Sequence, residues 1–171
     1  MSEGGIELAE HVAETLDVGP GTRVFEVDCG DGAFLFPFHQ NGFIVGGIDA
    51  DPDAIEQAIA AMPDGVFQIG TASALDPAIP WDVVVCRSLA GLSAEALAKA
   101  EAPDLHYLRG LLARMFAKAT HAIALIDVPD ERRQWMLHAL SEVGAKAIQF
   151  EDAKVDVGSA PGGRFNVFAR V

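Results

Sequence analysis

Short apolar runs alternate with amphipathic segments along almost the whole chain, and this alternation constrains the fold more than any other feature. A nearly continuous apolar run, such as residues 43–48, is typical of a strand buried on both faces of a parallel sheet. Apolar residues four apart, such as Leu8, Val12 and Leu16, are typical of a helix. Strands that alternate with helices predict βαβ units and a mostly parallel sheet with right-handed crossovers.

Seven segments are predicted to be strands: residues 23–28, 43–48, 66–69, 81–86, 121–126, 147–157 and 164–171. Five are predicted to be helices: residues 6–17, 33–40, 51–62, 93–118 and 130–143. Asp51 suits the N-cap of its helix and Pro52 the first helical position, whereas Pro37 kinks its helix or occupies an early turn. The fourth helix is expected to break near Pro103. The last two strands form a hairpin through residues 158–163, which places one antiparallel strand in the sheet.

The charge of the chain is distributed unevenly. The length of 171 residues predicts one domain, residues 1–171, with residues 1–18 as a leading helix. The net charge is −13. Residues 1–82 contain 15 acidic residues and one basic residue, whereas residues 83–171 contain ten acidic and eleven basic residues. An acidic surface repels phosphate backbones, so nucleic acid is not an expected partner.

The sequence favours a cytoplasmic protein that does not enter a membrane. Residues 1–8 are acidic and lack the apolar region of a signal peptide. No run approaches the roughly 18 apolar residues that would suggest a membrane span. Two cysteines, Cys29 and Cys86, in a chain of this size favour a reducing compartment over a disulfide scaffold.

The residues that follow each strand are the candidates for a binding site, because ligands of open α/β sheets bind outside the carboxyl ends of the strands. Gly30 and Gly32 follow the first strand and let the backbone approach a ligand closely. Asp49 ends the second strand, 17 residues past Gly32, where an acid can accept both ribose hydroxyls. This pattern predicts a nucleoside cofactor.

The charge of these loops distinguishes among nucleoside cofactors. The dinucleotide motif G-x-G-x-x-G requires a third glycine where this chain has Leu35, and Asp31 would repel a pyrophosphate. The absence of a G-x-x-x-x-G-K-[ST] loop excludes a P-loop NTPase. S-adenosylmethionine carries a nucleoside, a sulfonium cation and an ammonium group but no phosphate, so an acidic pocket suits it.

Residues 24–33 and 45–58 together resemble class I S-adenosylmethionine-dependent methyltransferases. The E/D-x-G-x-G-x-G loop of that family aligns with residues 26–32, its ribose-binding acid with Asp49, and its fourth strand with residues 81–86. The resemblance implies a three-layer α/β sandwich around a Rossmann-like, seven-stranded and mostly parallel sheet with an antiparallel C-terminal strand.

The same resemblance implies S-adenosylmethionine as the cofactor. It assigns to cofactor binding Glu26, Asp28, Cys29, Gly30, Gly32, Asp49, Ala50, Thr71, Ala72, Ser73 and Cys86. Two of these depart from the family pattern. Asp28 replaces the first loop glycine, although Asp tolerates a positive φ better than most residues, and Thr71 replaces an acid that accepts from adenine. Glu26 either orders the loop, meets the ammonium group through water, or is a structural acid.

Candidates for substrate binding are Arg87, Ser88, His11 and His39. Arg87 follows the fourth strand and either holds a substrate carboxylate bidentately or pairs with a nearby acid. The two cysteines either line the cofactor pocket or form a redox pair, and the first reading is favoured. The acids Asp49, Asp51 and Asp53 have the spacing of a calcium loop but lack its required glycine and glutamate, so no metal is expected.

The expected function is methyl transfer from S-adenosylmethionine to a small-molecule or protein acceptor, with no residue assigned as general base. A binding or scaffold subunit of the same fold that does no chemistry is the alternative, and an NAD-linked oxidoreductase is a third hypothesis. The chain is short for the family. The acceptor is therefore expected to be covered by the leading helix, by residues 87–110 or by a partner subunit, which leaves a homodimer open.

Overall fold

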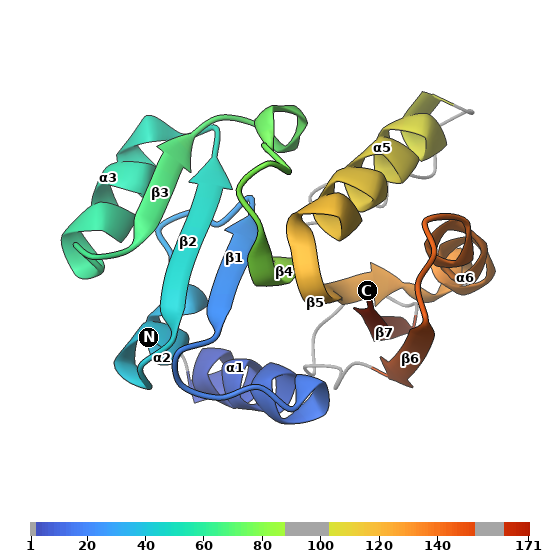
Figure 1. Ribbon diagram of the computed structural model, residues 1–171, viewed down its shortest axis with the longest axis horizontal. Helices are drawn as coiled ribbons and strands as arrows, with labels where there is room; N and C mark the ends of the chain where they lie inside the picture. Colours follow the sequence, from blue (N-terminus) through green and yellow to red (C-terminus); the bar gives the residue numbers. More distant parts are fainter. Residues whose placement is uncertain (1–2, 88–102, 153–162) are drawn as a thin grey trace.

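The computed structural model describes residues 3–87, 103–152 and 163–171. Its seven strands form one sheet in the order β3-β2-β1-β4-β5-β7-β6 (Figure 1). The strands are β1 (Arg23–Val27), β2 (Ile44–Asp49), β3 (Val66–Ile69), β4 (Trp81–Cys86), β5 (Ala119–Pro129), β6 (Ala147–Asp152) and β7 (Arg164–Arg170). Only β7 runs against its neighbours β5 and β6, which confirms the predicted mostly parallel sheet with an antiparallel C-terminal strand.

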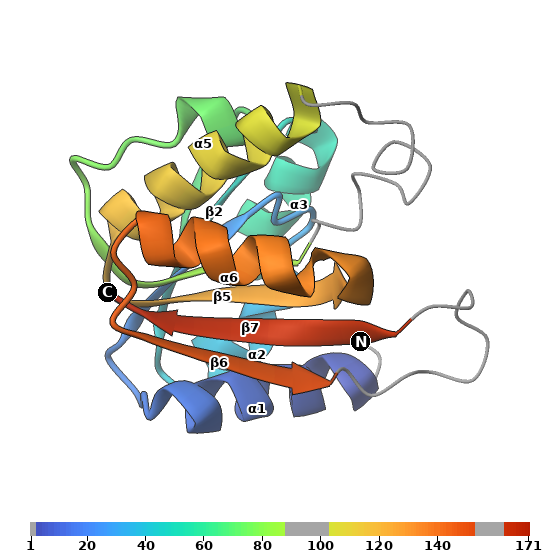
Figure 2. The same ribbon diagram turned by 90° about the vertical axis from the view of Figure 1, so that its right-hand side faces the viewer.

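Helices cover both faces of the sheet, with α1 on the side opposite to α5 and α6 (Figure 2). The helices are α1 (Glu3–Leu16), α2 (Leu35–Gln40), α3 (Pro52–Ala61), α5 (Pro103–Lys118) and α6 (Arg133–Glu142), with 3₁₀ turns η1 (Ala72–Ala74) and η3 (Asp130–Arg132). None of the helices in these described stretches combines the length and the hydropathy that crossing a membrane requires.

Two apolar clusters, one on each face of the sheet, hold the layers together. Alternate residues of a strand point to opposite faces, so Val24 and Val85 join the cluster under α1, α2 and α3, whereas Val27 and Val84 join the one under α5 and α6. All four of these valines are at most 1% exposed. Glu26 follows Val24 by two residues on β1. Its side chain therefore points to the same face of the sheet, toward the layer of α1 and α2.

Several element boundaries differ from the sequence prediction. The helix predicted over residues 33–40 begins at Leu35, with Pro37 in its first turn, where a missing N–H costs nothing. The helix predicted from Asp130 begins as the turn η3, and β5 extends beyond the predicted 121–126 at both ends. The predicted helical residues 93–102 and strand residues 153–157 lie outside the described residues.

The predicted cap of α3 is confirmed. Asp51 has an extended backbone, and its side chain accepts a hydrogen bond of 3.0 Å from the amide of Asp53, while Pro52 occupies the first turn. The cap starts α3 directly after β2, so β2 and α3 meet at the carboxyl edge of the sheet.

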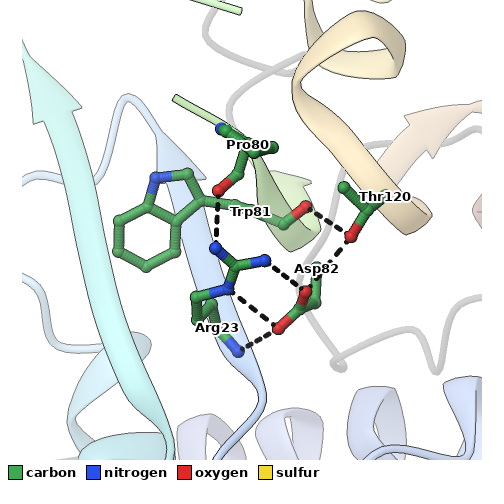
Figure 3. Close-up of polar contacts among 5 residues, drawn as sticks. All are labelled: Arg23, Pro80, Trp81, Asp82 and Thr120. Atoms are coloured by element: carbon green, nitrogen blue, oxygen red, sulfur yellow. Dashed lines mark hydrogen bonds and ion pairs between the residues drawn. The ribbon is translucent and has the colours of Figure 1, made fainter. Parts of the chain in front are cut away.

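At the opposite, amino edge of the sheet, Arg23 and Asp82 connect β1 to β4 (Figure 3). Asp82 accepts from the Arg23 backbone amide at 2.8 Å and from Nη2 at 2.7 Å, and Thr120 of β5 donates to it at 3.1 Å. The hydrogen bonds from Arg23 lower the pKa of Asp82 to about 2. Asp82, the second residue of β4, is therefore a structural link between β1, β4 and β5.

Asp82→Asn is expected to lower the free energy of unfolding by about 2 kcal/mol at pH 6, and by progressively less toward pH 2. An unfolded aspartate titrates near pH 3.9, so the ionised side chain stabilises the fold above that pH, and this contribution is lost as the pH falls through about 2. Urea unfolding between pH 6 and pH 3 measures the difference. Asp64→Asn, at an acid whose side chain is 79% exposed, is the control and should change little. An equal loss at both pH values would contradict the prediction.

Candidate functional site

The loop between β1 and α2 has an unusual backbone at three alternate positions. Asp28, Gly30 and Gly32 adopt φ values of 55°, 54° and 76°, in the left-handed region. A glycine carries no Cβ and adopts this conformation without strain, whereas Asp28 adopts it at some cost. The sequence anticipated that Asp28 would tolerate such a φ. The loop therefore exposes backbone and small residues at the carboxyl end of β1.

Asp49 ties this loop to the end of β2. Its Oδ2 accepts from the Gly30 amide at 2.7 Å, and its Oδ1 accepts from the Asp51 amide at 2.9 Å. The side chain is half-buried. Each carboxylate oxygen has more than one acceptor site, so both oxygens keep capacity for a further donor. Gly30 and Asp49, both assigned to cofactor binding from the sequence, are thus in direct contact.

Cys29 is packed against β2 beneath the loop. Its amide donates to the Ile48 carbonyl at 3.1 Å, and a Cβ on Gly47 would lie 2.5 Å from its Sγ. Burial, followed by the charges of Glu26 and Asp49, raises the pKa of the thiol to about 12. The thiol stays protonated at neutral pH, which argues against a redox role. Cys86 is also buried, and neither cysteine is in a disulfide, so both pack as small apolar residues.

The end of β3 lies next to the end of β2. The Gly70 amide donates to the Asp49 carbonyl at 2.8 Å, and the turn η1 follows. The hydroxyls of Thr71 and Ser73 are 2.6 Å apart and exposed, whereas Ala72 between them is buried. Ala50 is exposed after Asp49. The predicted residues of the second and third strand ends therefore come together at one edge.

Glu26 and Arg87 form an ion pair between β1 and β4. Arg87 Nε donates to Glu26 Oε1 at 2.6 Å, and the guanidinium carbon lies 4.6 Å from the centre of the Phe34 ring. Glu26 is fully buried, whereas the Arg87 side chain is 35% exposed. Of the two readings of Arg87 from sequence, the ion pair with a nearby acid is the one that the structure shows.

The burial of Glu26 changes its acidity. Burial raises its pKa to about 7, against the opposing effect of Arg87, and the charges of Asp28 and Asp31 raise it further. Its second oxygen, Oε2, is buried without a hydrogen-bond partner among the described residues. A carboxyl with this pKa changes charge within the physiological range, whereas an exposed glutamate does not.

Comparisons with known proteins identify the fold. No protein-family model and no curated protein matches the sequence. Among solved structures, magnesium protoporphyrin IX methyltransferase from Synechocystis PCC 6803 with bound S-adenosylmethionine is 17% identical, with a TM-score of 0.70 over 98% of this chain and 80% of that one. A TehB-like S-adenosylmethionine-dependent methyltransferase from Corynebacterium glutamicum is 17% identical, with a TM-score of 0.64 over 98% and 86%.

A third structure, the N-terminal domain of EvdMO1 with S-adenosylhomocysteine bound, is 17% identical, with a TM-score of 0.69 over 99% of this chain and 82% of that one. All three match at least 98% of this chain. The chain has the class I S-adenosylmethionine-dependent methyltransferase fold. The fold implied by the resemblance of residues 24–33 and 45–58 is therefore confirmed.

The methyltransferase fold does not bring the two candidate histidines to the glycine loop. His39 lies at the end of α2, near the amino edge of the sheet, and is 2.6 Å from Asp64. His11 on α1 is 2.5 Å from Glu151 of β6, and its ring meets Phe168 edge-on. We therefore assign neither histidine to the site. Ser88 lies outside the described residues.

Two residues near the loop were not anticipated in their roles. The ring of Phe34 packs against the Arg87 guanidinium, 4.6 Å from the guanidinium carbon. Tyr107, the only tyrosine of the chain, lies on α5, where burial and then the negative charge of Asp28 raise the pKa of its hydroxyl. The sequence did contain signals for these two roles. One is an aromatic residue beside the glycine loop, and the other is a tyrosine in the helix after β4. Their proximity to the loop depends on the packing of α2 and α5.

Proposed function

We propose that the chain is an S-adenosylmethionine-dependent methyltransferase that acts on a small-molecule or protein acceptor. The observation that carries the proposal is the contact between the Asp49 carboxylate and the Gly30 amide, beside a loop with two left-handed glycines. In this arrangement an acid can accept from the ribose hydroxyls, and the backbone of the glycine loop can contact the rest of the nucleoside. The surrounding acids oppose a phosphate, so a cationic cofactor fits better than a dinucleotide.

In this proposal Asp49 accepts from the ribose hydroxyls, and the loop of Asp28, Cys29, Gly30 and Gly32 lies along the cofactor. The adenine would be held by residues at the second and third strand ends: Ala50, Thr71, Ala72 and Ser73. The exposed hydroxyls of Thr71 and Ser73 supply the hydrogen bonds that an acid supplies in the family. Cys86 closes the pocket from β4. Glu26 is too deeply buried for direct contact and acts by holding Arg87.

The cofactor supplies a methyl group that is attacked in line by a nucleophilic lone pair of the acceptor as the carbon–sulfur bond breaks. The protein's contribution is to align the acceptor with that carbon and to exclude water. No side chain among the described residues is assigned as a base, so an acceptor that must lose a proton would give it to water or to a residue elsewhere.

The proposal includes a cytoplasmic location, because both cysteines are buried thiols that form no disulfide. It also takes residues 1–171 as one domain. The cover of the acceptor is expected to be the leading helix, residues 87–110 or a partner subunit, and residues 88–102 lie outside the described residues. Neither point affects the residues assigned to the cofactor.

The experiment is a calorimetric titration of the full chain with S-adenosylmethionine, S-adenosylhomocysteine and NAD. We expect both adenosyl ligands to bind with dissociation constants below about 1 mM and NAD not to bind in that range. Absence of adenosyl-ligand binding would overturn the proposal, and selective NAD binding would favour an oxidoreductase.

A binding subunit that does no chemistry is the second candidate, and Asp28 in the position of a loop glycine favours it. The side chain of Asp28 lies at the surface of the loop with a strained backbone. If the first candidate is right, Asp28→Gly should leave adenosyl-ligand affinity unchanged or increase it. Binding that appears only in Asp28→Gly would instead indicate a site that has lost its function.

A further inference from the structure

Arg87 stands at the junction of β1 and β4. The two strands are parallel neighbours with Val27 opposite Cys86, so Arg87 leaves β4 beside the start of the glycine loop. Glu26 is opposite Val85 in the same register, and Arg87 follows Val85 by two residues, so both charged side chains point to the same face of the sheet. The ion pair therefore lies directly under the carboxyl edge at which the proposed cofactor binds.

Two contacts hold the Arg87 guanidinium in one orientation. The short hydrogen bond from Nε to Glu26 sets the direction of one edge, and the Phe34 ring, itself 2% exposed, lies 4.6 Å from the guanidinium carbon. Within residues 3–87, 103–152 and 163–171, the hydrogen bond of Arg87 goes to Glu26 and uses Nε alone. The outer edge, formed by Nη1 and Nη2, carries two parallel N–H donors, and the side chain is 35% exposed.

We propose that this outer edge of Arg87 binds a carboxylate group of a ligand at the carboxyl edge of the sheet. A guanidinium edge matches a carboxylate through two parallel hydrogen bonds, and a fixed guanidinium loses little entropy when it binds. The inference rests on the proposed function, within which the carboxylate has two sources. It belongs either to the amino-acid end of the cofactor or to the methyl acceptor.

The surrounding charges limit the ligand to a single negative charge. Glu26 offsets the charge of Arg87 when it is ionised, and Asp28, Asp31 and Asp49 lie in the adjacent loops. A phosphate dianion would meet this negative field with twice the repulsion of a carboxylate. A carboxylate that is part of a zwitterion meets still less repulsion, because the ammonium group of the zwitterion is attracted to the same acids.

The test follows the Arg87 Nε–H resonance by nitrogen-15 NMR at pH 7, where it is assigned from its loss in Arg87→Lys. Three probes are used: S-adenosylhomocysteine, 5′-methylthioadenosine, which lacks the amino-acid end, and benzoate added to protein saturated with S-adenosylhomocysteine. Arg164→Lys is the matched control, because Arg164 also lies at the carboxyl edge and is paired with an acid, Asp127, at 2.8 Å. The lysine variant keeps the charge of Arg87 and loses only the two-donor edge.

If the cofactor supplies the carboxylate, S-adenosylhomocysteine shifts the Arg87 resonance and 5′-methylthioadenosine does not. Arg87→Lys then weakens S-adenosylhomocysteine binding by at least about tenfold and leaves 5′-methylthioadenosine within about twofold. If the acceptor supplies it, only benzoate shifts the resonance, and Arg87→Lys weakens the binding of benzoate by at least about tenfold in a calorimetric titration.

Two results would overturn the inference. One is an Arg87 resonance that responds to none of the three probes, and the other is an equal loss of affinity for both adenosyl ligands in Arg87→Lys. The failure of the proposed function looks different, since no resonance of the wild-type protein would then respond to S-adenosylhomocysteine. In that case benzoate added to the ligand-free protein decides the inference by itself.

Discussion

Arg87→Ala is expected to lower the free energy of unfolding by about 3 kcal/mol at pH 8, but by only about 1 kcal/mol at pH 5. At pH 8 most Glu26 side chains are ionised, because the pKa of this carboxyl is about 7. The variant then leaves a fully buried carboxylate without its partner. At pH 5 Glu26 holds a proton, so the variant loses mainly one hydrogen bond and the contact of Arg87 with Phe34.

The raised pKa of Glu26 also makes the wild-type stability depend on pH. An unfolded glutamate titrates near pH 4.3, so between that pH and about 7 the folded chain binds more protons than the unfolded chain. The stabilising contribution is fully present below about pH 4 and is lost as the pH rises through about 7. Glu26→Gln, which cannot ionise, is expected to remove this loss and to flatten the pH dependence.

Urea unfolding at pH 5 and pH 8, followed by the fluorescence of the two tryptophans, measures both effects. Arg109→Ala is the matched control, since Arg109 and Glu142 form an ion pair of 3.4 Å in which both side chains are nearly half exposed. Such a pair contributes little, so the control should change stability by less than about 0.5 kcal/mol at either pH. An Arg87→Ala effect of the same size at both pH values would contradict the assigned charge of Glu26.

Asp49→Ala is expected to weaken S-adenosylhomocysteine binding by at least about 30-fold, measured by calorimetry at pH 7.5. The variant removes a carboxylate that would accept two hydrogen bonds from the ribose, each worth about 1.5–3 kcal/mol when one partner is charged. It also removes the acceptor of the Gly30 amide, which lies 2.7 Å away, so the glycine loop loses its connection to β2.

Two further variants separate these causes. Asp49→Asn keeps one acceptor oxygen and is expected to fall between Asp49→Ala and the wild type. Asp53→Ala is the control, because the exposed Asp53 lies on the same segment and contributes only its backbone to the described hydrogen bonds. Unchanged affinity in Asp49→Ala would contradict the assignment of the ribose site while leaving the proposed cofactor in place.

Much of the fold was predictable because the signals for it are local. The Asp51-Pro52 cap specified the start of α3 correctly, since both the side-chain cap and the fixed φ of proline act within one turn. The boundaries of segments that lack a capping residue, a glycine or a proline at their ends were predicted less accurately. β5 exceeds its predicted length because it pairs with β4 on one side and β7 on the other, and pairing partners extend a strand beyond its apolar run.

The candidate site was predictable at the strand ends, where an acid and a glycine each have a single expected role. The contact of Asp49 with Gly30 follows from two neighbouring strand ends, and the sequence located both. The histidines were placed poorly because a polar residue on an amphipathic helix gives no indication of which edge of the sheet it reaches. His39 follows α2 to the amino edge, away from the glycine loop.

The sequence by itself determined the βαβ order, the glycine loop and the acid at the end of the second strand, because periodicity, caps and turn residues act over a few positions. Only the tertiary structure decided that Glu26 and Arg87, 61 residues apart, form a pair supported by Phe34. That pairing requires β4 to lie beside β1 and both side chains to point to the same face. Burial by the helix layer, which no local pattern specifies, then sets the acidity of Glu26.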